Sequence, residues 1–453
     1  MRRRATTLLM TLVCLFCLGL FVPNDASAQV VIVGGQDEPV TEIRKAEIID
    51  SVTALVNRMY VFPDVAKKME TAVRKKKKGG GYKEFSNMMP FMQALDKDMK
   101  DICKDGHFGI MFDPNPRPAG QEVSPEMEKE HLENERRNNY GFNKLEILPG
   151  NIGYLNLLGF TSADIAGPTA TAAMNFLGNT DALIIDLREN GGGDPSMIQL
   201  ISSYFFKTAV HLNSFQERGK DTVQQFWTSL GVQGKKMVDA PIYVLTSSFT
   251  FSAAEEFTYN LKSLKRATIV GENTGGGAHP VNEYAFPTLK VSARVPYARA
   301  INPITGTNWE SVGVKPDIEV ARDKALAVAH LEAIEALETK ATDDARKRDY
   351  RWLAERIAAE NDPPTIVEQE LAGFAGKYGP RVITFETGGL FSQREGGPKF
   401  QLIPMTRELF RFGGNSADYL RLRFQRDSTG TVTGVVAVFQ DGREEPFTRQ
   451  VAN

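Results

Sequence analysis

The sequence has few cysteines and histidines, no excess of charge of either sign, and no long apolar run after its first 28 residues. Two of the three cysteines, Cys14 and Cys17, fall within that first segment, so Cys103 stands alone and a disulfide framework within one chain is excluded. Lysine and arginine number 54 against 56 aspartate and glutamate residues, a balance that does not favour binding to nucleic acid. The sequence also contains no internal repeat and no glycine-rich phosphate-binding loop of standard spacing.

Residues 1–28 have the pattern of a secretory signal. Arginines follow Met1, an apolar stretch spans 8–22, and Ala26-Ser27-Ala28 is a small-residue cleavage site. We therefore expect an exported protein, periplasmic or extracellular, with no membrane span once the signal is removed. The alternative is a retained N-terminal anchor, which the short length of the apolar stretch disfavours.

The rest of the chain changes its pattern several times. Apolar residues at helical spacing give way to a Pro-rich and then densely charged stretch, and after that short apolar runs alternate with helical stretches. Such alternation predicts an α/β fold with a largely buried sheet, in which catalytic groups gather in loops beyond strand ends. The predicted parts are an N-terminal helical domain (29–112), a charged connector (113–140), an α/β core (141–321), a helical segment (322–362) and a small C-terminal β module (363–453). Within the core, the expected strands are 152–157, 182–187, 242–246 and 267–270, and the expected helices are 168–177, 195–206 and 252–264.

Ser252 lies at the most informative turn of the sequence. The chain leaves an apolar strand at Thr246, turns through small polar residues and enters a helix at Ser252. A serine in this position exposes its hydroxyl, and the free N–H groups of a helix start can stabilise an oxyanion. The same residues also suit an ordinary helix cap, because Ser252 with Glu255 three positions later forms a capping box. A second turn, Gly191 to Gly193, again follows an apolar strand, and glycines let the backbone approach a ligand closely.

A serine nucleophile needs a base, which is normally a histidine. Of the five histidines, His131 lies in the charged connector, His330 in a helical pattern, and His211 at a helix end without polar neighbours. The remaining candidates are His107, which closely follows Asp105, and His279, which follows a run of glycines.

Several short motifs occur in the order that is found in C-terminal processing proteases, also called tail-specific proteases. They are Ile152-Gly153-Tyr154-Leu155, Asp186-Leu187-Arg188 followed by Asn190 and the glycines, Thr246-Ser247 leading to Phe251-Ser252-Ala253-Ala254-Glu255, Val270-Gly271-Glu272 followed by Thr274 and Gly275, and Gly313-Val314-Lys315-Pro316-Asp317. From about residue 41 to 320 the chain resembles this serine protease superfamily. The resemblance implies a crotonase-like α/β protease core of the ClpP/crotonase type.

The superfamily has two catalytic variants, and the resemblance favours one of them. In the processing-protease branch the base is a lysine in the loop after the Val-Gly-Glu motif, but Gly277 occupies that position here. The tricorn-core branch, which includes repeats of interphotoreceptor retinoid-binding protein, has a histidine after the N-terminal helices. Its orienting glutamate lies just before the Gly-Val-x-Pro-Asp motif, and His107 and Glu310 match these two positions.

The similarity to the tricorn core implies a role for each residue. His107 would be the general base of Ser252, and Glu310 would hold its imidazole and stabilise the protonated ring. The amides of Gly192 and Ala253 would form the oxyanion hole. One departure is Gly106, which stands where the tricorn core has a serine, so a fourth, proton-sharing hydroxyl is missing.

We therefore expect a serine peptidase without cofactor or metal that acts on peptides or unfolded proteins through an acyl-enzyme on Ser252, internally or at the carboxy terminus. His279 is the reserve base. The connector is too short for the PDZ domain that processing proteases commonly insert, so selection of free chain ends through such a domain is not expected. The alternatives are a non-catalytic binding protein for apolar ligands or peptides on the same scaffold, and an esterase that uses the same serine.

Overall fold

The computed structural model describes residues 37–117, 124–414 and 418–450. The predicted signal at 1–28 lies outside the described residues, as does the stretch 118–123 of the predicted connector. The described part of the connector contains α4 (Pro125–Arg137), which buries none of its residues. Within the described ranges, no helix has the length and apolar character that a membrane crossing needs.

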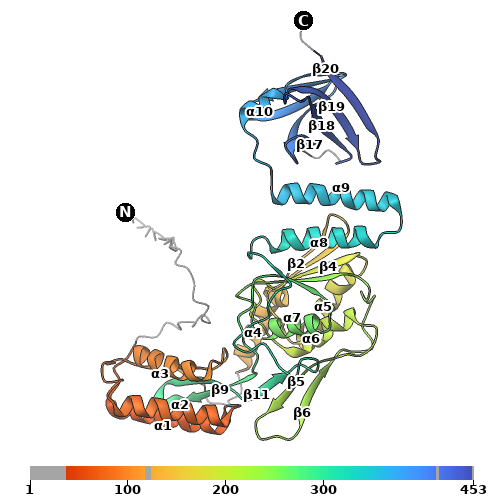
Figure 1. Ribbon diagram of the computed structural model, residues 1–453. Coiled ribbons are helices and arrows are strands. Elements are labelled where there is room, and N and C mark those ends of the chain that lie inside the picture. Colours follow the sequence, from red (N-terminus) through yellow and green to blue (C-terminus); the bar gives the residue numbers. More distant parts are fainter. Residues whose placement is uncertain (1–36, 118–123, 415–417, 451–453) are drawn as a thin grey trace, which may run out of the picture. The chain divides into compact units, whose positions relative to one another are not determined.

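The N-terminal part is built from α1 (Glu42–Met59), α2 (Pro63–Lys78) and α3 (Met88–Cys103). The Thr41 side chain begins α1 by accepting a hydrogen bond from the N–H of Arg44, 3.2 Å away. Pro63 is the first residue of α2. A backbone N–H at this position would have no acceptor within the helix, so a proline costs no hydrogen bond here. The apolar faces of the three helices share one core with a small antiparallel sheet (Figure 1).

That small sheet joins distant segments of the chain. Its strand order is β1-β10-β9, with β1 (Gly109–Phe112), β10 (Val291–Pro296) and β9 (Val281–Phe286). β1 follows α3 directly, whereas β9 and β10 come from the middle of the predicted α/β core. Because β1 pairs with β10, the loop between α3 and β1 is held close to the turns of the core.

The core is a six-stranded sheet in the order β12-β8-β7-β4-β3-β2. The strands are β12 (Ile318–Glu319), β8 (Thr268–Gly271), β7 (Ile242–Thr246), β4 (Ala182–Asp186), β3 (Ile152–Leu157) and β2 (Phe142–Leu148). All neighbours pair in parallel except β2, which runs antiparallel at one edge. This arrangement confirms the predicted α/β core.

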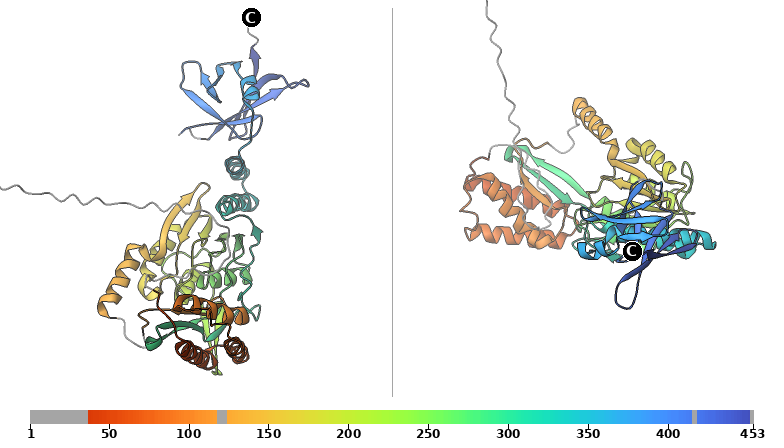
Figure 2. Two further views of the ribbon diagram at one scale, coloured as in Figure 1. Left: turned by 90° about the vertical axis from the view of Figure 1, so that its left-hand side faces the viewer. Right: turned by 90° about the horizontal axis from the view of Figure 1, so that it is seen from above.

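Helices cover both faces of this sheet (Figure 1). One face carries α5 (Ala163–Leu177), α6 (Pro195–Ser202) and α7 (Ala253–Ser263), and the other carries α8 (Ala325–Lys340), beside which α9 (Asp344–Asn361) runs (Figure 2). Alternate residues of β4 point to opposite faces: Leu183 packs with α5–α7, and Ile184 packs with α8. The sheet is therefore buried on both sides, which explains its continuous apolar strands.

Helix α5 begins earlier than the sequence pattern predicts. The expected start was residue 168, but the helix starts at Ala163, where Ser162 caps it by accepting a hydrogen bond from the N–H of Asp164. Pro168 consequently lies inside the helix.

A second three-stranded sheet, in the order β11-β5-β6, lies beside the core. It contains β11 (Ala298–Ile301), β5 (His211–Glu217) and β6 (Val223–Trp227). Its aromatic side chains Phe215 and Phe226 pack together with Trp309 in a small cluster of their own. Short 3-10 turns occur at Asn139–Gly141, Ser203–Phe205 and Pro287–Leu289.

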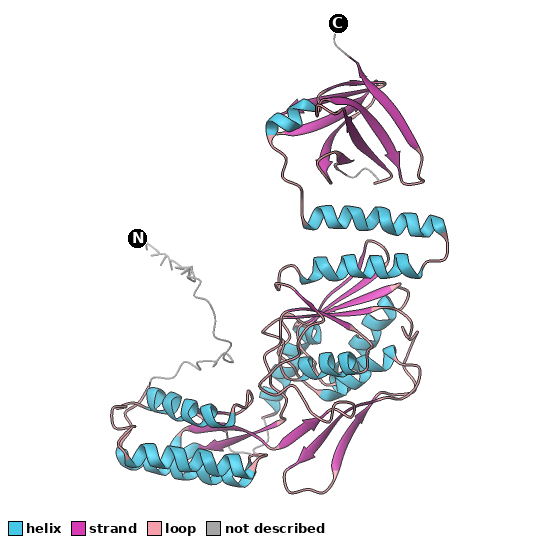
Figure 3. Ribbon diagram, viewed as in Figure 1, coloured by secondary structure: helices cyan, strands magenta, loops and turns pink. Residues whose placement is uncertain are grey.

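The C-terminal part is almost entirely strand (Figure 3). After the short helix α10 (Glu368–Gly373), eight strands pair antiparallel in sequence order. The last strand pairs with the first, so the sheet closes into a barrel. Phenylalanines such as Phe374, Phe410 and Phe424 form much of the core of this barrel. The strands are β13 (Gly376–Tyr378), β14 (Arg381–Glu386), β15 (Gly389–Arg394), β16 (Lys399–Pro404), β17 (Leu409–Phe412), β18 (Leu420–Arg426), β19 (Val432–Phe439) and β20 (Glu444–Gln450). The predicted C-terminal β module is confirmed.

Candidate active site

Ser252 occupies a sharp turn between β7 and α7. Its φ angle is 56°, a region that residues with a side chain seldom enter. Its N–H donates a hydrogen bond to Oε2 of Glu255, 3.0 Å away, which is one half of the capping box that the sequence suggests. Glu255 also accepts hydrogen bonds from the N–H groups of Gly276 and Gly277, at 2.7 and 2.8 Å. The turn is therefore fixed from two sides, and the serine hydroxyl remains partly exposed.

His107 reaches this serine from the N-terminal part of the chain. Its Nε2 lies 3.0 Å from the Oγ of Ser252, although the two residues belong to segments far apart in the sequence. Burial lowers the pKa of the His107 imidazole to about 4, against the opposing pull of the Asp105 charge. The ring is consequently neutral at pH 7 and can accept the proton of the serine. The imidazole also contacts the ring of Phe251 at a tilt of 43°, with a centroid distance of 4.8 Å.

Gly277 leaves the room that His107 uses. A Cβ atom at this glycine would lie 2.9 Å from Cε1 of His107 and 2.2 Å from Cζ of Phe251. A residue with a side chain at position 277 would therefore collide with His107 and Phe251 as they are placed here.

Glu310 approaches the loop that carries His107, but not the imidazole. Its Oε1 accepts a hydrogen bond from the N–H of Gly106 at 2.8 Å, and its Oε2 accepts from the N–H groups of Ala278 and His279 at 2.6 and 3.2 Å. No described group bonds the Nδ1 of His107. The expected contact between Glu310 and the imidazole is thus replaced by a contact with the backbone next to it, because the carboxylate is already occupied by main-chain donors.

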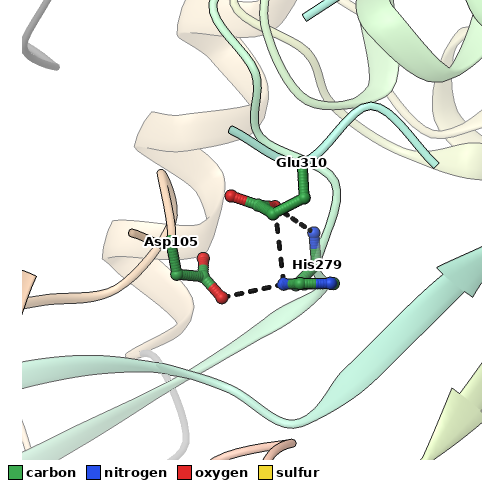
Figure 4. Close-up of side chains that lie close together, drawn as sticks. All are labelled: Asp105, His279 and Glu310. Carbon is green, nitrogen blue, oxygen red and sulfur yellow. Dashed lines mark hydrogen bonds and ion pairs between the residues drawn. The ribbon is translucent and has the colours of Figure 1, made fainter. Parts of the chain in front are cut away.

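His279 lies between the carboxylates of Asp105 and Glu310 (Figure 4). Its Nδ1 lies 2.8 Å from Oδ2 of Asp105 and 3.4 Å from Oε2 of Glu310. Asp105 in turn accepts hydrogen bonds from the N–H of His107 at 3.1 Å and from the hydroxyl of Tyr60 at 3.2 Å. His279, the reserve base, makes no hydrogen bond with Ser252 in the part of the chain that the structure describes, so the geometry favours His107 as the base.

The same three side chains have the spacing of a candidate metal site. One ligand atom from each of Asp105, His279 and Glu310 lies within 4.8 Å of the others. Protein donors already engage these atoms, however, because Oδ2 of Asp105 accepts from Tyr60 and Oε2 of Glu310 accepts from two backbone N–H groups. A buried hydrogen-bonded network accounts for this cluster without a cation.

Gly192 packs directly against Ser252. With φ at 115°, a Cβ here would meet the Cβ of Ser252 at 2.8 Å and the N of Ala253 at 3.0 Å. Its N–H donates to Oδ1 of Asn190 at 2.9 Å, so the predicted oxyanion donor is occupied by a neighbouring side chain. Ala253 is the first residue of α7, so no preceding helical turn supplies a carbonyl acceptor for its N–H.

The chain is similar to a known peptidase family and to several solved structures. The model of peptidase family S41 matches residues 151–320. A candidate peptidase from Parabacteroides merdae ATCC 43184 is 19% identical, with a TM-score of 0.46 over 65% of this chain and 97% of the other. The photosystem II D1 C-terminal processing protease is 16% identical, with a TM-score of 0.37 over 63% and 94% of the two chains. The tricorn protease is 13% identical, with a TM-score of 0.42 over 70% and 37%.

Residues 151–320 form a domain of peptidase family S41. This S41 domain contains Ser252, Glu310 and Gly192, whereas His107 comes from outside the matched segment. The pairing of β1 with β10 brings that histidine to the S41 domain.

Side-chain hydrogen bonds join the two turns of the S41 domain that meet at the site. The hydroxyl of Ser247 donates to the carbonyl of Arg188 at 2.5 Å, and that of Thr250 donates to the carbonyl of Leu187 at 2.8 Å. Arg188 itself is held by a two-pronged ion pair with Asp186, at 2.8 and 2.6 Å. The Asp-Leu-Arg and Thr-Ser motifs of the sequence therefore position the glycine turn and the serine turn relative to each other.

The remaining histidines have other partners. His211 bonds the hydroxyl of Ser214 at 2.8 Å, and His330 bonds the carbonyl of Pro149 at 2.8 Å. His131 lies exposed on α4.

The sequence did not predict the involvement of Asp105 and Glu256. Asp105 contacts His107 and His279, and Glu256 lines the same cleft as Ser252. The position of Asp105 two residues before His107 was the only signal for it.

Proposed function

We propose that this protein is an exported serine peptidase that hydrolyses peptide bonds of peptides or unfolded proteins. The observation that carries the proposal is the 3.0 Å separation between Nε2 of His107 and Oγ of Ser252, a serine that lies in the segment matched by a peptidase family. This distance suits transfer of the serine proton to a neutral imidazole.

In the proposed reaction, Oγ of Ser252 forms a bond with the carbonyl carbon of the substrate while His107 takes its proton. The protonated His107 then gives this proton to the nitrogen of the leaving amine as the C–N bond breaks, which leaves an acyl-enzyme. Water, deprotonated by the same imidazole, cleaves the ester and restores Ser252. In this scheme the N–H of Ala253 donates to the developing oxyanion.

Two carboxylates share the role that a single acid has in a standard triad. Glu310 positions His107 by holding the N–H of Gly106, and the charge of Asp105 favours the protonated imidazole. His279 ties both carboxylates together, so the loop that carries the base is fixed before substrate binds.

Hydrolysis of casein by the wild type and by Ser252→Ala tests this function. The wild type should cleave and the variant should be at least about 10³-fold slower, because the acyl-enzyme cannot form. Equal cleavage by both proteins would refute the assignment. An ester matched to a cleaved peptide would show whether peptides or esters are the better substrates.

The proposal of export rests on the N-terminal sequence pattern. Expression of the full chain in a bacterial host, followed by N-terminal sequencing of the released protein, tests it. We expect the mature chain to begin at Gln29. Full-length protein held in the membrane fraction would instead support a retained anchor.

A further inference from the structure

Glu256 is a buried carboxylate beside the nucleophile that the proposed reaction does not use. It lies one helical turn after Ser252 on α7, and its N–H donates to the carbonyl of Ser252 at 2.9 Å. The residue is only 4% exposed, and its Oε1 is buried without a hydrogen-bond partner. Among the described residues, no ion pair neutralises it. A carboxyl group in this state is costly to the fold unless a ligand uses it.

The polar neighbours of Glu256 are also incompletely bonded. Both polar atoms of the Asn213 carboxamide and the Nδ2 of Asn260 are buried without a partner among the described residues. These two amides lie close to the carboxylate and act to lower its pKa, but they carry no charge that could neutralise it. Burial prevails and raises the pKa of Glu256 to about 7. The group can therefore change its charge near neutral pH when a ligand binds.

Glu256 and Ser252 line the same cleft, whose volume is about 580 Å³. Aromatic side chains form much of its wall, namely Phe215, Phe226, Tyr297 and Trp309. Of the acidic groups in the cleft, Asp194 is engaged by the hydroxyl and the N–H of Ser196, at 2.6 and 2.8 Å. No lysine or arginine lines this cleft within the described part of the chain.

This composition fits a long cationic side chain. Aromatic faces attract a cation and cover its aliphatic stem, and an unpaired carboxylate supplies a specific partner for its charged end. Residues four apart on a helix have Cβ atoms about 5–6 Å apart, a distance that an extended lysine or arginine side chain can cover.

We propose that Glu256 recognises a lysine or arginine side chain of the substrate next to the bond that Ser252 attacks, so that the peptidase cleaves preferentially at basic residues. This inference rests on the proposed function and names its substrate class. When the cation binds, Glu256 gives its proton to solvent and stays ionised, which relieves the unpaired carboxyl group.

Matched peptides test the preference. They differ only in the residue on the amino-terminal side of the scissile bond, which is lysine, arginine, glutamine or leucine. For the wild type we expect kcat/KM to be at least about tenfold higher for lysine or arginine than for leucine, as one well-placed ion pair allows. Glu256→Gln should lower that ratio at least about tenfold. Glu130→Gln removes the same charge from an exposed position on α4 and should leave the ratio unchanged.

A second measurement uses the wild type alone, and it decides the matter should Glu256→Gln fail to fold. The pH dependence of the steps that both peptides share, such as proton transfer to His107, cancels in the ratio of kcat/KM for the lysine peptide to that for the leucine peptide. The ratio therefore reports the charge of Glu256. We expect this ratio to rise as pH increases through about 7, where Glu256 loses its proton. A flat ratio, no basic preference, or a preference that Glu256→Gln retains would overturn the inference. Cleavage that depends on Ser252 but prefers apolar residues would overturn it and still support the proposed function.

Discussion

Glu310 holds the main-chain N–H of Gly106 at 2.8 Å, so this carboxylate acts on the residue before the proposed base and not on its ring. Gly106 has no hydroxyl that could pass on a proton, and it contacts Glu310 through its backbone N–H alone. The acid of this site therefore positions the loop of His107. Its contribution should be smaller than that of the residues that handle the proton.

Replacement of Glu310 measures this positioning role. Glu310→Gln puts an amide where three backbone N–H groups now donate, so at least one donor must lose its partner. We expect kcat/KM to fall roughly 10- to 100-fold, mostly through kcat, because Glu310 positions the loop of the base but does not itself transfer a proton. Steady-state kinetics with one peptide checks this, with Glu130→Gln as the control. A loss as large as that of Ser252→Ala would show that Glu310 handles the proton directly.

The glycine turn offers a pair of adjacent substitutions. Gly192→Ala places a Cβ against Ser252 and Ala253 and strains a backbone with φ at 115°, so we expect at least about a 100-fold loss of kcat/KM. Gly191→Ala adds a methyl group with no heavy atom within 4 Å and should remain active. Similar activity of the two variants would contradict the close packing of this turn on the nucleophile.

The pH dependence of serine labelling follows from the pKa of His107. Only the neutral imidazole can accept the serine proton, and burial lowers its pKa to about 4. The labelling rate with a fluorophosphonate should therefore persist as pH falls through 6.5 and decline only near 4. A decline centred near 6.5, the ordinary value for histidine, would show that the ring is not desolvated as described.

Chelation separates the two interpretations of the cluster of Asp105, His279 and Glu310. If these groups only bond one another and the backbone, dialysis against EDTA should leave casein hydrolysis unchanged. Loss of activity with EDTA and recovery on addition of zinc would show that the cluster holds a functional metal ion.

Local patterns predicted most of the fold, and the reasons are visible in particular elements. Short apolar runs bounded by Gly, Pro or Asn predicted β4 and β7, and the runs are continuously apolar because both faces of these strands are buried. Alternation predicted strands in the C-terminal part but not their closure, since the pairing of β13 with β20 depends on residues distant in sequence. The pattern did not predict that α5 begins at Ala163, because proline is typical of the first turn of a helix, whereas Pro168 lies inside this one.

The sequence likewise predicted some residues of the candidate site and not others. Ser252 was recognisable from its own strand, turn and helix, whereas His107 entered only through a resemblance, because no local pattern tells which distant loop will meet a serine. The same resemblance predicted that Glu310 lies near the base, but not that it bonds a backbone N–H in place of the ring. Glu255 and Glu256 are adjacent in the sequence, and only the structure shows that the first bonds the serine turn while the second faces the cleft.

The central claim is that His107 activates Ser252, and the rate of covalent labelling tests it most directly. A fluorophosphonate probe, followed by peptide mapping with mass spectrometry, locates the adduct and gives the rate for the wild type and for His107→Asn. We predict an adduct on Ser252 that forms at least about 10³-fold more slowly in the variant, with both proteins folded by circular dichroism. Equal labelling rates, or an adduct on another residue, would contradict the account.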